Sequence, residues 1–388
     1  MTASHLILSP RTKRVSLRAS RRPRVAAAAL ALVACSAAAA ATATAQARQV
    51  KDAGARVERV ADGVYAIIHD DATDQWPHGN TGVVVGDDGV LVVDSDYLPS
   101  RARADIALIR SLTDKPVKYL VITHWHFDHN NGTVAYRDAF PGVTIVSERA
   151  TRDYIELNGV WWAKMSTAPN SARRAALAQL ETRLASGADS AGRPLSADEK
   201  KALAVAVRQR KAELEELASL RVVPPNLVFD HELTLTLGRR RIQLRDWGRA
   251  NSPHDVTIYL PDDRVLFTGD ILVQSPLPYL GASWPVPWAD VLRQVEAVPV
   301  VALVPGHGPV MRDHGYTRQV RELLEVAAVR VDSLARQGMT LEQIQDAVTL
   351  EDFRTKVAVW NDPALQADWK TITRILVERV WRGVRGQG

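Results

Sequence analysis

The chain of 388 residues has a single cysteine, Cys35. A framework of internal disulfide bonds is therefore excluded. Residues 1–47 contain no Asp or Glu, although seven of the 49 Lys and Arg residues lie there. The rest of the chain is consequently slightly acidic, so the formal net charge of +5 does not indicate a nucleic-acid partner. Repeats and low-complexity segments are also absent after residue 47.

Residues 1–47 have the pattern of an export signal and not of a folded domain. A basic region that ends at Arg24 precedes an uncharged, alanine-rich run, and Ala45 and Ala47 form an A-x-A cleavage site. The run is too weakly apolar to favour a transmembrane anchor. A second interpretation stays open, because Leu32 to Cys35 resembles a lipoprotein box. Both routes predict an exported protein, periplasmic or secreted, that meets a membrane only through a lipid on Cys35.

The remaining chain predicts an α/β protein. Residues 48–314 alternate strand-like apolar runs with helices, as in one domain built on buried sheets. Between about 150 and 222, Ala, Leu, Arg and Glu dominate, and Ser196 with Glu199 forms a capping box. We interpret this segment as an inserted helical hairpin. It is either a surface insert that forms part of the wall of a functional site, or a lid that covers that site, and we favour the surface insert. Residues 315–388 predict helices packed on the same domain, at about 315–337, 341–348 and 362–384.

The strongest chemical signal is "THWHFDHN", residues 123–130, at the end of a predicted buried strand. Alternate residues of a strand share a face, so His124 and His126 can bind one metal ion. The turn that follows carries Asp128 and His129 toward a second position. Imidazole and carboxylate groups are ligands that zinc prefers. The motif therefore predicts one or two divalent metal ions, with zinc favoured.

This stretch resembles the HxHxDH motif of the metallo-β-lactamase-fold hydrolases. Three further stations follow the family's order, namely Asp94 after "GVLVV", Asp270 in "VLFTGD" and His307 in "LVPGHG". The resemblance covers about residues 57–310 apart from the helical insert, and it implies a four-layer αββα sandwich with metals at the edge of the two sheets. It also implies which residues bind: His124 and His126 the first metal, Asp128, His129 and His307 the second, with Asp270 bridging the two.

The same resemblance implies a reaction. A metal-bound hydroxide would attack an ester, lactone, amide or phosphoester in a small molecule. Asp128 would orient the hydroxide and handle its proton, and Asp94 would accept a hydrogen bond from a ligand histidine. A β-lactamase is one alternative. A weakly catalytic or non-catalytic protein that binds a metal or ligand through a degraded first site is another. The sequence does not determine the oligomeric state.

One loop departs from the family pattern, "GRANSPHD", residues 248–255. Asn251 stands where family members have the third histidine of the first metal, and its amide oxygen is a neutral, weak donor. His254 is a better ligand type but lies three residues later, behind the stiff Pro253. Three interpretations stay open: Asn251 faces the metal directly or through water, His254 replaces it, or neither does. In each case we predict a tighter second site.

Several aromatic residues are candidates for a substrate pocket. Tyr279, Trp284 and Trp288 follow the strand that carries Asp270, and they line a pocket or pack against the insert. Trp161 and Trp162 are predicted to anchor the insert in the core. His78 is predicted to lie in a surface loop.

Overall fold

The computed structural model describes residues 54–386 except 70–77, 275–279, 358–359 and 362–365. The predicted export signal with Cys35 lies outside these residues, as does Tyr279. Residues 47–388 form one compact unit. None of the helices in the described ranges combines the length and apolarity needed to cross a bilayer.

The first sheet contains seven strands in the order in which they occur along the chain. They are β1 (Ala55–Ala61), β2 (Val64–His69), β3 (Thr81–Val85), β4 (Val90–Val93), β5 (Val117–Val121), β6 (Thr144–Glu148) and β7 (Leu227–Phe229). Strands β1 to β4 pair antiparallel, and β4 to β7 pair parallel. The change of pairing follows from the connections. The short turn at residues 86–89 joins neighbours antiparallel, whereas the later connections contain helices that return the chain to the same end.

The second sheet has the order β12-β11-β10-β9-β8. Its strands are β8 (Glu232–Leu237), β9 (Arg240–Asp246), β10 (Val256–Leu260), β11 (Val265–Val273) and β12 (Ala302–His307). Only the β11–β12 pair among these is parallel. The two sheets pack through an apolar layer that includes Val84, Leu91, Val121, Ile258 and Phe267. Gly82 permits this close packing, because a Cβ there would lie 2.6 Å from Cε1 of Phe267.

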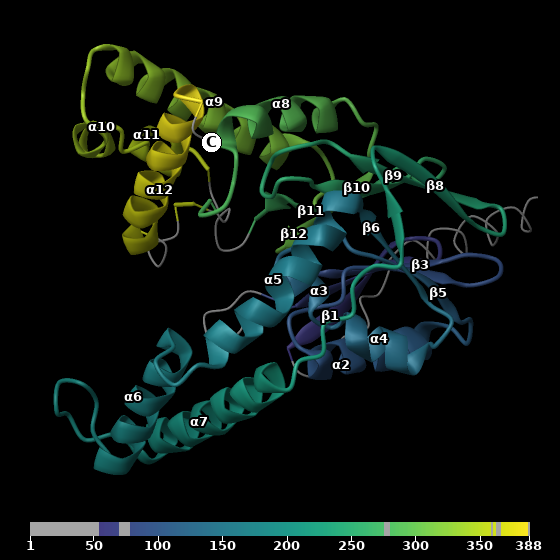
Figure 1. Ribbon diagram of the computed structural model, residues 1–388, viewed down its shortest axis with the longest axis horizontal. Coiled ribbons are helices and arrows are strands. Elements are labelled where there is room, and N and C mark those ends of the chain that lie inside the picture. Colours follow the sequence, from purple (N-terminus) through teal and green to yellow (C-terminus); the bar gives the residue numbers. More distant parts are fainter. Residues whose placement is uncertain (1–53, 70–77, 275–279, 358–359, 362–365, 387–388) are drawn as a thin grey trace, which may run out of the picture. The chain divides into compact units, whose positions relative to one another are not determined.

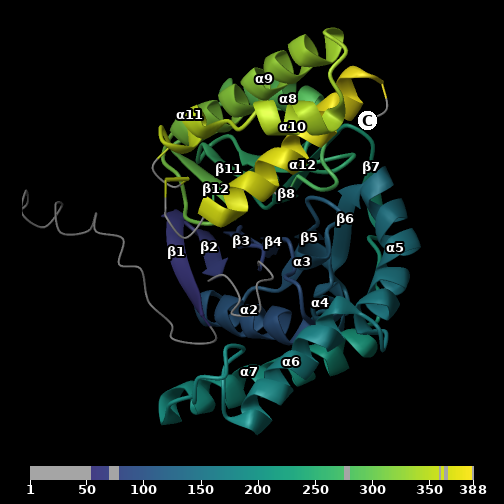
Figure 2. The same ribbon diagram turned by 90° about the vertical axis from the view of Figure 1, so that its left-hand side faces the viewer.

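Helices cover the outer face of each sheet (Figures 1 and 2). Helices α2 (Pro99–Leu112) and α4 (Thr133–Ala139) pack on the first sheet through an apolar cluster that contains Ile106, Ile109, Tyr136, Val83 and Leu120. Helices α8 (Pro285–Glu296), α9 (Gly315–Arg336) and α12 (Gln366–Val384) cover the second sheet through the largest apolar cluster. Because both faces of the central strands are covered, every residue of β11 is buried. The predicted αββα sandwich is confirmed.

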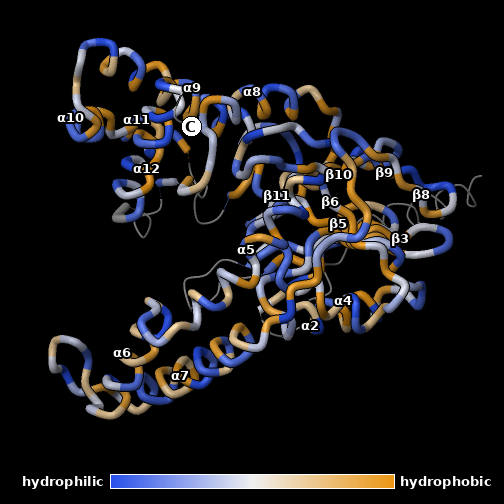
Figure 3. Tube along the Cα trace, viewed as in Figure 1, coloured by the Kyte–Doolittle hydropathy of each residue, from blue (hydrophilic) through white to orange (hydrophobic). Residues whose placement is uncertain are grey.

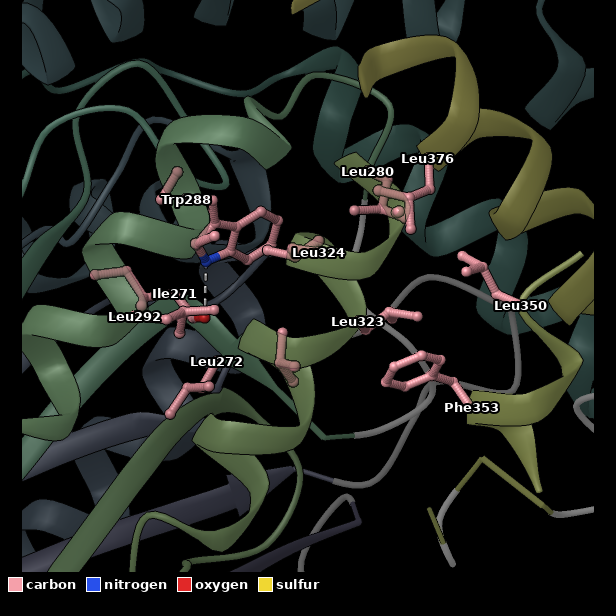
Figure 4. Close-up of a cluster of buried hydrophobic side chains, with 14 of the residues drawn as sticks. Ile271, Leu272, Leu280, Trp288, Leu292, Leu323, Leu324, Leu350, Phe353 and Leu376 are labelled. Atoms are coloured by element: carbon pink, nitrogen blue, oxygen red, sulfur yellow. Dashed lines mark hydrogen bonds between the residues drawn. The ribbon is translucent and has the colours of Figure 1, made fainter. Parts of the chain in front are cut away.

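The C-terminal helices join the second sheet's outer layer. Figure 4 shows Leu323 of α9, Leu376 of α12 and Phe353 in one buried cluster. Helix α10 (Leu341–Ala347) begins with a capping box between Thr340 and Gln343, at the position that the sequence predicts. The short helix α11 (Glu351–Arg354) is not predicted, because a single turn has no apolar periodicity of its own.

The insert contains three helices, α5 (Arg149–Thr167), α6 (Ala172–Ser186) and α7 (Ala197–Ala218). The capping box of Ser196 and Glu199 starts α7, and Gly187 ends α6 with a left-handed φ of 65°. Figure 3 shows hydrophobic residues gathered along the strands, whereas hydrophobic and hydrophilic residues alternate along α7. Trp162 anchors the insert by stacking on Phe127, with ring centroids 3.9 Å apart. The same prediction for Trp161 is wrong, since its side chain is exposed.

Candidate metal centre

The HxHxDH residues follow β5 and extend into the one-turn helix α3 (Phe127–Asn130). His124 and His126 precede this helix, and Asp128 and His129 lie within it. The Asn130 amide holds the turn by donating hydrogen bonds of 2.7 Å to the carbonyl oxygens of Trp125 and His126. A strand end followed directly by a helical turn therefore points four potential ligands into one buried space.

The structure brings the predicted ligands together in two buried groups, His124 with His126 and Asp270, and Asp128 with His129 and His307. Asp270 lies between the groups. Its Oδ2 is 3.6 Å from His124 Nε2, and its Oδ1 is 3.2 Å from His129 Nε2. Within the second group, His307 Nε2 is 3.1 Å from Asp128 Oδ2. The carboxylate of Asp270 thus has the placement that a bridging ligand needs, although metal binding by these residues stays a prediction.

The hydrogen-bond chemistry around His129 fits a metal ion. Its Nδ1 lies 2.8 Å from Asp94 Oδ2, and a carboxylate only accepts, so the proton of the neutral ring is on Nδ1. Its Nε2 then presents a lone pair to the carboxylates of Asp128 and Asp270, at 3.5 and 3.2 Å. Acceptors that converge in this way require a positive species among them, which a divalent cation supplies.

The pKa shifts agree with this requirement. Burial and the neighbouring His129 and His126 lower the pKa of His124 well below its usual value, so that this ring is neutral and able to coordinate. Burial also opposes a charge on His129, but Asp270 and Asp128 outweigh it and raise the pKa well above the usual value. Without a metal ion, His129 therefore holds a proton at the position where a metal would bind.

Asp94 and Gly306 position two of the candidate ligands, His129 and Asp270. Asp94 accepts hydrogen bonds from the backbone N–H and the hydroxyl of Thr123 as well as facing His129. The hydrogen bond expected of Asp94 is thus present. Gly306 on β12 lies against Asp270, and a Cβ at this position would be 2.0 Å from Asp270 Oδ1. The backbone of β12 can approach this carboxylate because residue 306 has no side chain.

The irregular loop at residues 248–255 separates its two candidate ligands. Asn251 is fully buried, whereas the side chain of His254 is 37% exposed. His254 Nδ1 lies 3.0 Å from Asp246 Oδ2, and this hydrogen bond raises the pKa of His254 above its usual value. His254 is thus held outside the two ligand groups, and its proposed role as a replacement ligand is corrected. Coordination by Asn251, directly or through water, stays a prediction.

Asp255, which ends the same loop, is a buried residue of the centre that was not predicted from the sequence. The backbone N–H of Ser252 donates to its Oδ2 at 2.7 Å, while its Oδ1 is buried without a hydrogen-bond partner in the described structure. Burial raises the pKa of Asp255 to about 7, and the nearby Asp270 adds to the shift. The available signal in the sequence is an Asp directly before a buried strand.

Trp288 and Trp284, two of the residues predicted for a substrate pocket, have different environments in the structure. Trp288 is completely buried and donates from Nε1 to the carbonyl oxygen of Ile271 at 3.2 Å (Figure 4), so its assignment to a substrate pocket is corrected. Trp284 borders the irregular loop, since its backbone N–H donates to the carbonyl oxygen of Ala250 at 2.8 Å.

Trp125, which lies between His124 and His126 in the motif itself, was also not predicted as a residue of the site. Its ring centroid is 4.8 Å from that of His126, and it stacks on Tyr154 of α5 at 5.6 Å. His78 is a further correction. It is buried and not on the surface, and its Nδ1 lies 3.2 Å from Asp96 Oδ1.

The chain is similar to known proteins both in sequence and in fold. The model of the metallo-beta-lactamase superfamily matches residues 74–333. A linear primary-alkylsulfatase from a Pseudomonas species is 25% identical over 276 residues, which is 68% of this chain and 48% of that protein. The chain thus spans about half the length of this curated relative. The solved structure of a metallo-beta-lactamase from Pontibacter korlensis superposes with a TM-score of 0.50 at 16% identity, over 70% of this chain and 99% of that chain. That likeness shows the shared fold.

Proposed function

We propose, since the chain belongs to the metallo-beta-lactamase superfamily, that it is a metal-dependent hydrolase that cleaves ester bonds in small molecules with an apolar group. The observation that carries the proposal is Asp270, whose two oxygens face one histidine-containing group each. Divalent metal ions held by these groups, with zinc favoured, would supply Lewis-acid activation of water and of the scissile bond.

Asp128 supports the hydrolytic role. Burial opposes its ionisation, but His129 and His307 outweigh burial and lower the pKa of Asp128 well below its usual value. The carboxylate is therefore ionised at neutral pH and can accept a hydrogen bond from the attacking water. It lies 3.1 Å from His307 Nε2, so its orientation is set by the same residues that form the second group.

An apolar surface beside the site supports the substrate class. Trp125 touches the His126 ring and stacks on Tyr154, where α5 leaves the first sheet. Three more exposed apolar residues follow Tyr154 on the same face of α5, spaced at three, four and four residues: Leu157, Trp161 and Met165. An exposed apolar row of this kind is unusual on a soluble surface and suits an alkyl or aryl group of a ligand. The alkylsulfatase relative brings alkyl sulfates into this class.

The test is a hydrolysis panel on the zinc-loaded protein, with alkyl sulfates and carboxylic esters of increasing chain length, a phosphate ester, a lactone and a β-lactam. We expect kcat/KM to rise with chain length by up to about fourfold per buried CH₂, from about 0.8 kcal/mol each. Asp128→Asn should abolish turnover. Trp161→Ser should flatten the chain-length dependence, whereas Val329→Ser, at a position 70% exposed on α9, should leave it unchanged.

Two outcomes would replace the proposal. Turnover of the β-lactam alone would identify a β-lactamase. Stoichiometric zinc binding with no turnover of any member of the panel would identify a non-catalytic metal-binding protein.

We also propose that the protein is exported. The support is the basic, then alanine-rich pattern of residues 1–47 with its A-x-A site. Mass spectrometry of the mature protein from the native cell envelope distinguishes cleavage after Ala47 from lipidation at Cys35. A full-length chain in the cytoplasm would contradict both.

A further inference from the structure

A second buried cluster of metal-ligand side chains lies outside the candidate metal centre. It consists of His69 at the end of β2, Asp96 after β4 and Asp105 on α2. All three are buried, and their ligand atoms lie within 4.8 Å of one another. The hydrolytic role proposed above uses none of them.

The tautomer of His69 follows from its partners. Nδ1 lies 2.7 Å from the carbonyl oxygen of Gly79, which can only accept a hydrogen bond, so Nδ1 carries a proton. Nε2 lies 3.0 Å from Asp105 Oδ1 and 3.6 Å from Asp96 Oδ2. In a neutral ring, Nε2 would direct a lone pair at two carboxylates. The space between these atoms therefore requires a positive species, either a second proton on His69 or a metal ion.

The two carboxylates are arranged as ligands are. Asp96 Oδ1 accepts from the backbone N–H of Tyr97 and lies 3.2 Å from His78 Nδ1, and Asp105 Oδ2 accepts from the Thr81 hydroxyl at 2.6 Å. Each carboxylate thus has one oxygen oriented by protein donors and the other directed at His69 Nε2. Such outer partners orient the first-shell groups of metal sites.

An independent observation points to a missing ligand. Asp96 is fully buried, yet its Oδ2 has no hydrogen-bond donor in the part of the chain that the structure describes. The ion pairs that Asp96 and Asp105 form within these residues are all with histidines. A buried carboxylate oxygen without a hydrogen-bond donor destabilises the folded state unless a cation neutralises it.

We propose that His69, Asp96 and Asp105 form a third site for a divalent metal ion, separate from the catalytic pair. One imidazole and two carboxylates suit zinc or manganese, and a divalent ion balances both carboxylate charges while His69 stays neutral. The site would join β2, the segment after β4 and α2. That segment also contains Ser95, whose N–H and hydroxyl donate to the carbonyl oxygen of His129 at 2.9 and 3.1 Å. The ion therefore has a structural role, because it fixes the segment that holds the backbone of His129.

The competing arrangement is an imidazolium at His69. Burial lowers the pKa of His69, but Asp105 and Asp96 outweigh it and raise the pKa to about 9 when no metal is bound. The same two carboxylates thus attract either a proton or a metal ion, and the two arrangements differ in metal content.

Metal content and anomalous diffraction decide between them. The full chain is purified from zinc-supplemented cells, washed free of unbound zinc and analysed by plasma mass spectrometry. Asp105→Asn and His69→Gln are expected to lose one zinc equivalent per chain relative to wild type. Asp88→Asn, at a carboxylate that is 51% exposed and pairs with Lys118 outside the cluster, is the matched control and should keep that equivalent.

Crystals of the wild-type protein make the test independent of how the variants fold. An anomalous peak at the zinc edge beside His69 Nε2 would establish the site. Peaks at the catalytic centre without one at His69 would overturn it, as would ¹⁵N NMR spectra that show both His69 nitrogens protonated in the zinc-loaded protein. Neither readout depends on which bond the enzyme hydrolyses.

Discussion

Replacing Gly306 with alanine tests whether the position of the Asp270 carboxylate determines metal binding. Gly306 lies on β12 directly against this side chain, and a Cβ there would be 2.0 Å from Asp270 Oδ1 and 2.9 Å from its backbone nitrogen. Real Cβ atoms essentially never approach a neighbour within 3.0 Å, so the carboxylate oxygen has to move by about 1 Å. The residue that moves is the one that faces both ligand groups.

The size of the effect follows from this displacement. Asp270 Oδ1 is 3.2 Å from His129 Nε2, and Oδ2 is 3.6 Å from His124 Nε2, so a shift of about 1 Å changes both sides of the centre. Loss of a group that orients a metal ligand typically costs 10- to 100-fold in metal affinity, and a misplacement of about 1 Å costs on the order of 100-fold in rate. For Gly306→Ala we expect zinc affinity to fall by about 10- to 100-fold and kcat/KM by about 100-fold.

Zinc affinity is measured by competition with a chromophoric chelator, and folding by circular dichroism. Gly142→Ala is the matched control, because a Cβ there has no heavy atom within 4 Å. If Gly306→Ala folds and retains wild-type zinc affinity, Asp270 does not bridge the two groups and our account of the centre is wrong.

Three further predictions concern the surroundings of the centre. Asp94→Ala removes the acceptor for His129 Nδ1 and should lower zinc affinity by about 10- to 100-fold in the same titration. Trp162→Ala removes the stack on Phe127 and should weaken the attachment of the insert by about 2 kcal/mol, seen as roughly 30-fold faster limited proteolysis between α6 and α7. Asp255→Asn should stabilise the chelator-treated protein more at pH 8 than at pH 5, by about 2–3 kcal/mol in urea unfolding. The folded-state pKa of Asp255, about 7, lies above the ordinary pKa of 3.8 for an aspartate, so the wild type loses stability as pH rises through that interval.

Each of these predictions has a contrary result, and Trp162→Ala also has a matched control. For Asp94→Ala, unchanged zinc affinity would mean that Thr123 alone holds the turn. For Trp162→Ala, the exposed Trp161→Ala is the control, and equal cleavage rates for both variants would contradict the anchor. For Asp255→Asn, a stability gain of equal size at pH 5 and pH 8 would show that the gain does not come from ionisation.

Much of the fold is predictable from local patterns. The capping box of Ser196 and Glu199 and the glycine that ends α6 act within a few residues, so their sequence signals survive in the structure. The strands of both sheets have continuous apolar runs because helices cover their outer faces. Helix α11 cannot be predicted in this way. It is one turn between two longer helices, and its conformation depends on the packing of Phe353.

Aromatic residues show where local patterns fail. Trp288 and Trp161 are both tryptophans in helices, but one is completely buried and the other is 60% exposed. Their environments depend on which face of each helix meets a sheet, and that is a property of the assembled layers.

The candidate metal centre divides in the same way. The sequence by itself determined the contiguous candidate ligands, because HxHxDH at a strand end fixes four side chains within one turn. The pairing of His254 with Asp246 and the burial of Asp255 near Asp270 could not be predicted from the sequence. Both environments arise because the loop folds against another strand. Only the tertiary structure joined His69, Asp96 and Asp105, which come from three elements and share no local pattern. Spacing between nearby residues can be read directly from the sequence. Burial and charge pairing between distant residues exist only after the sheets have packed.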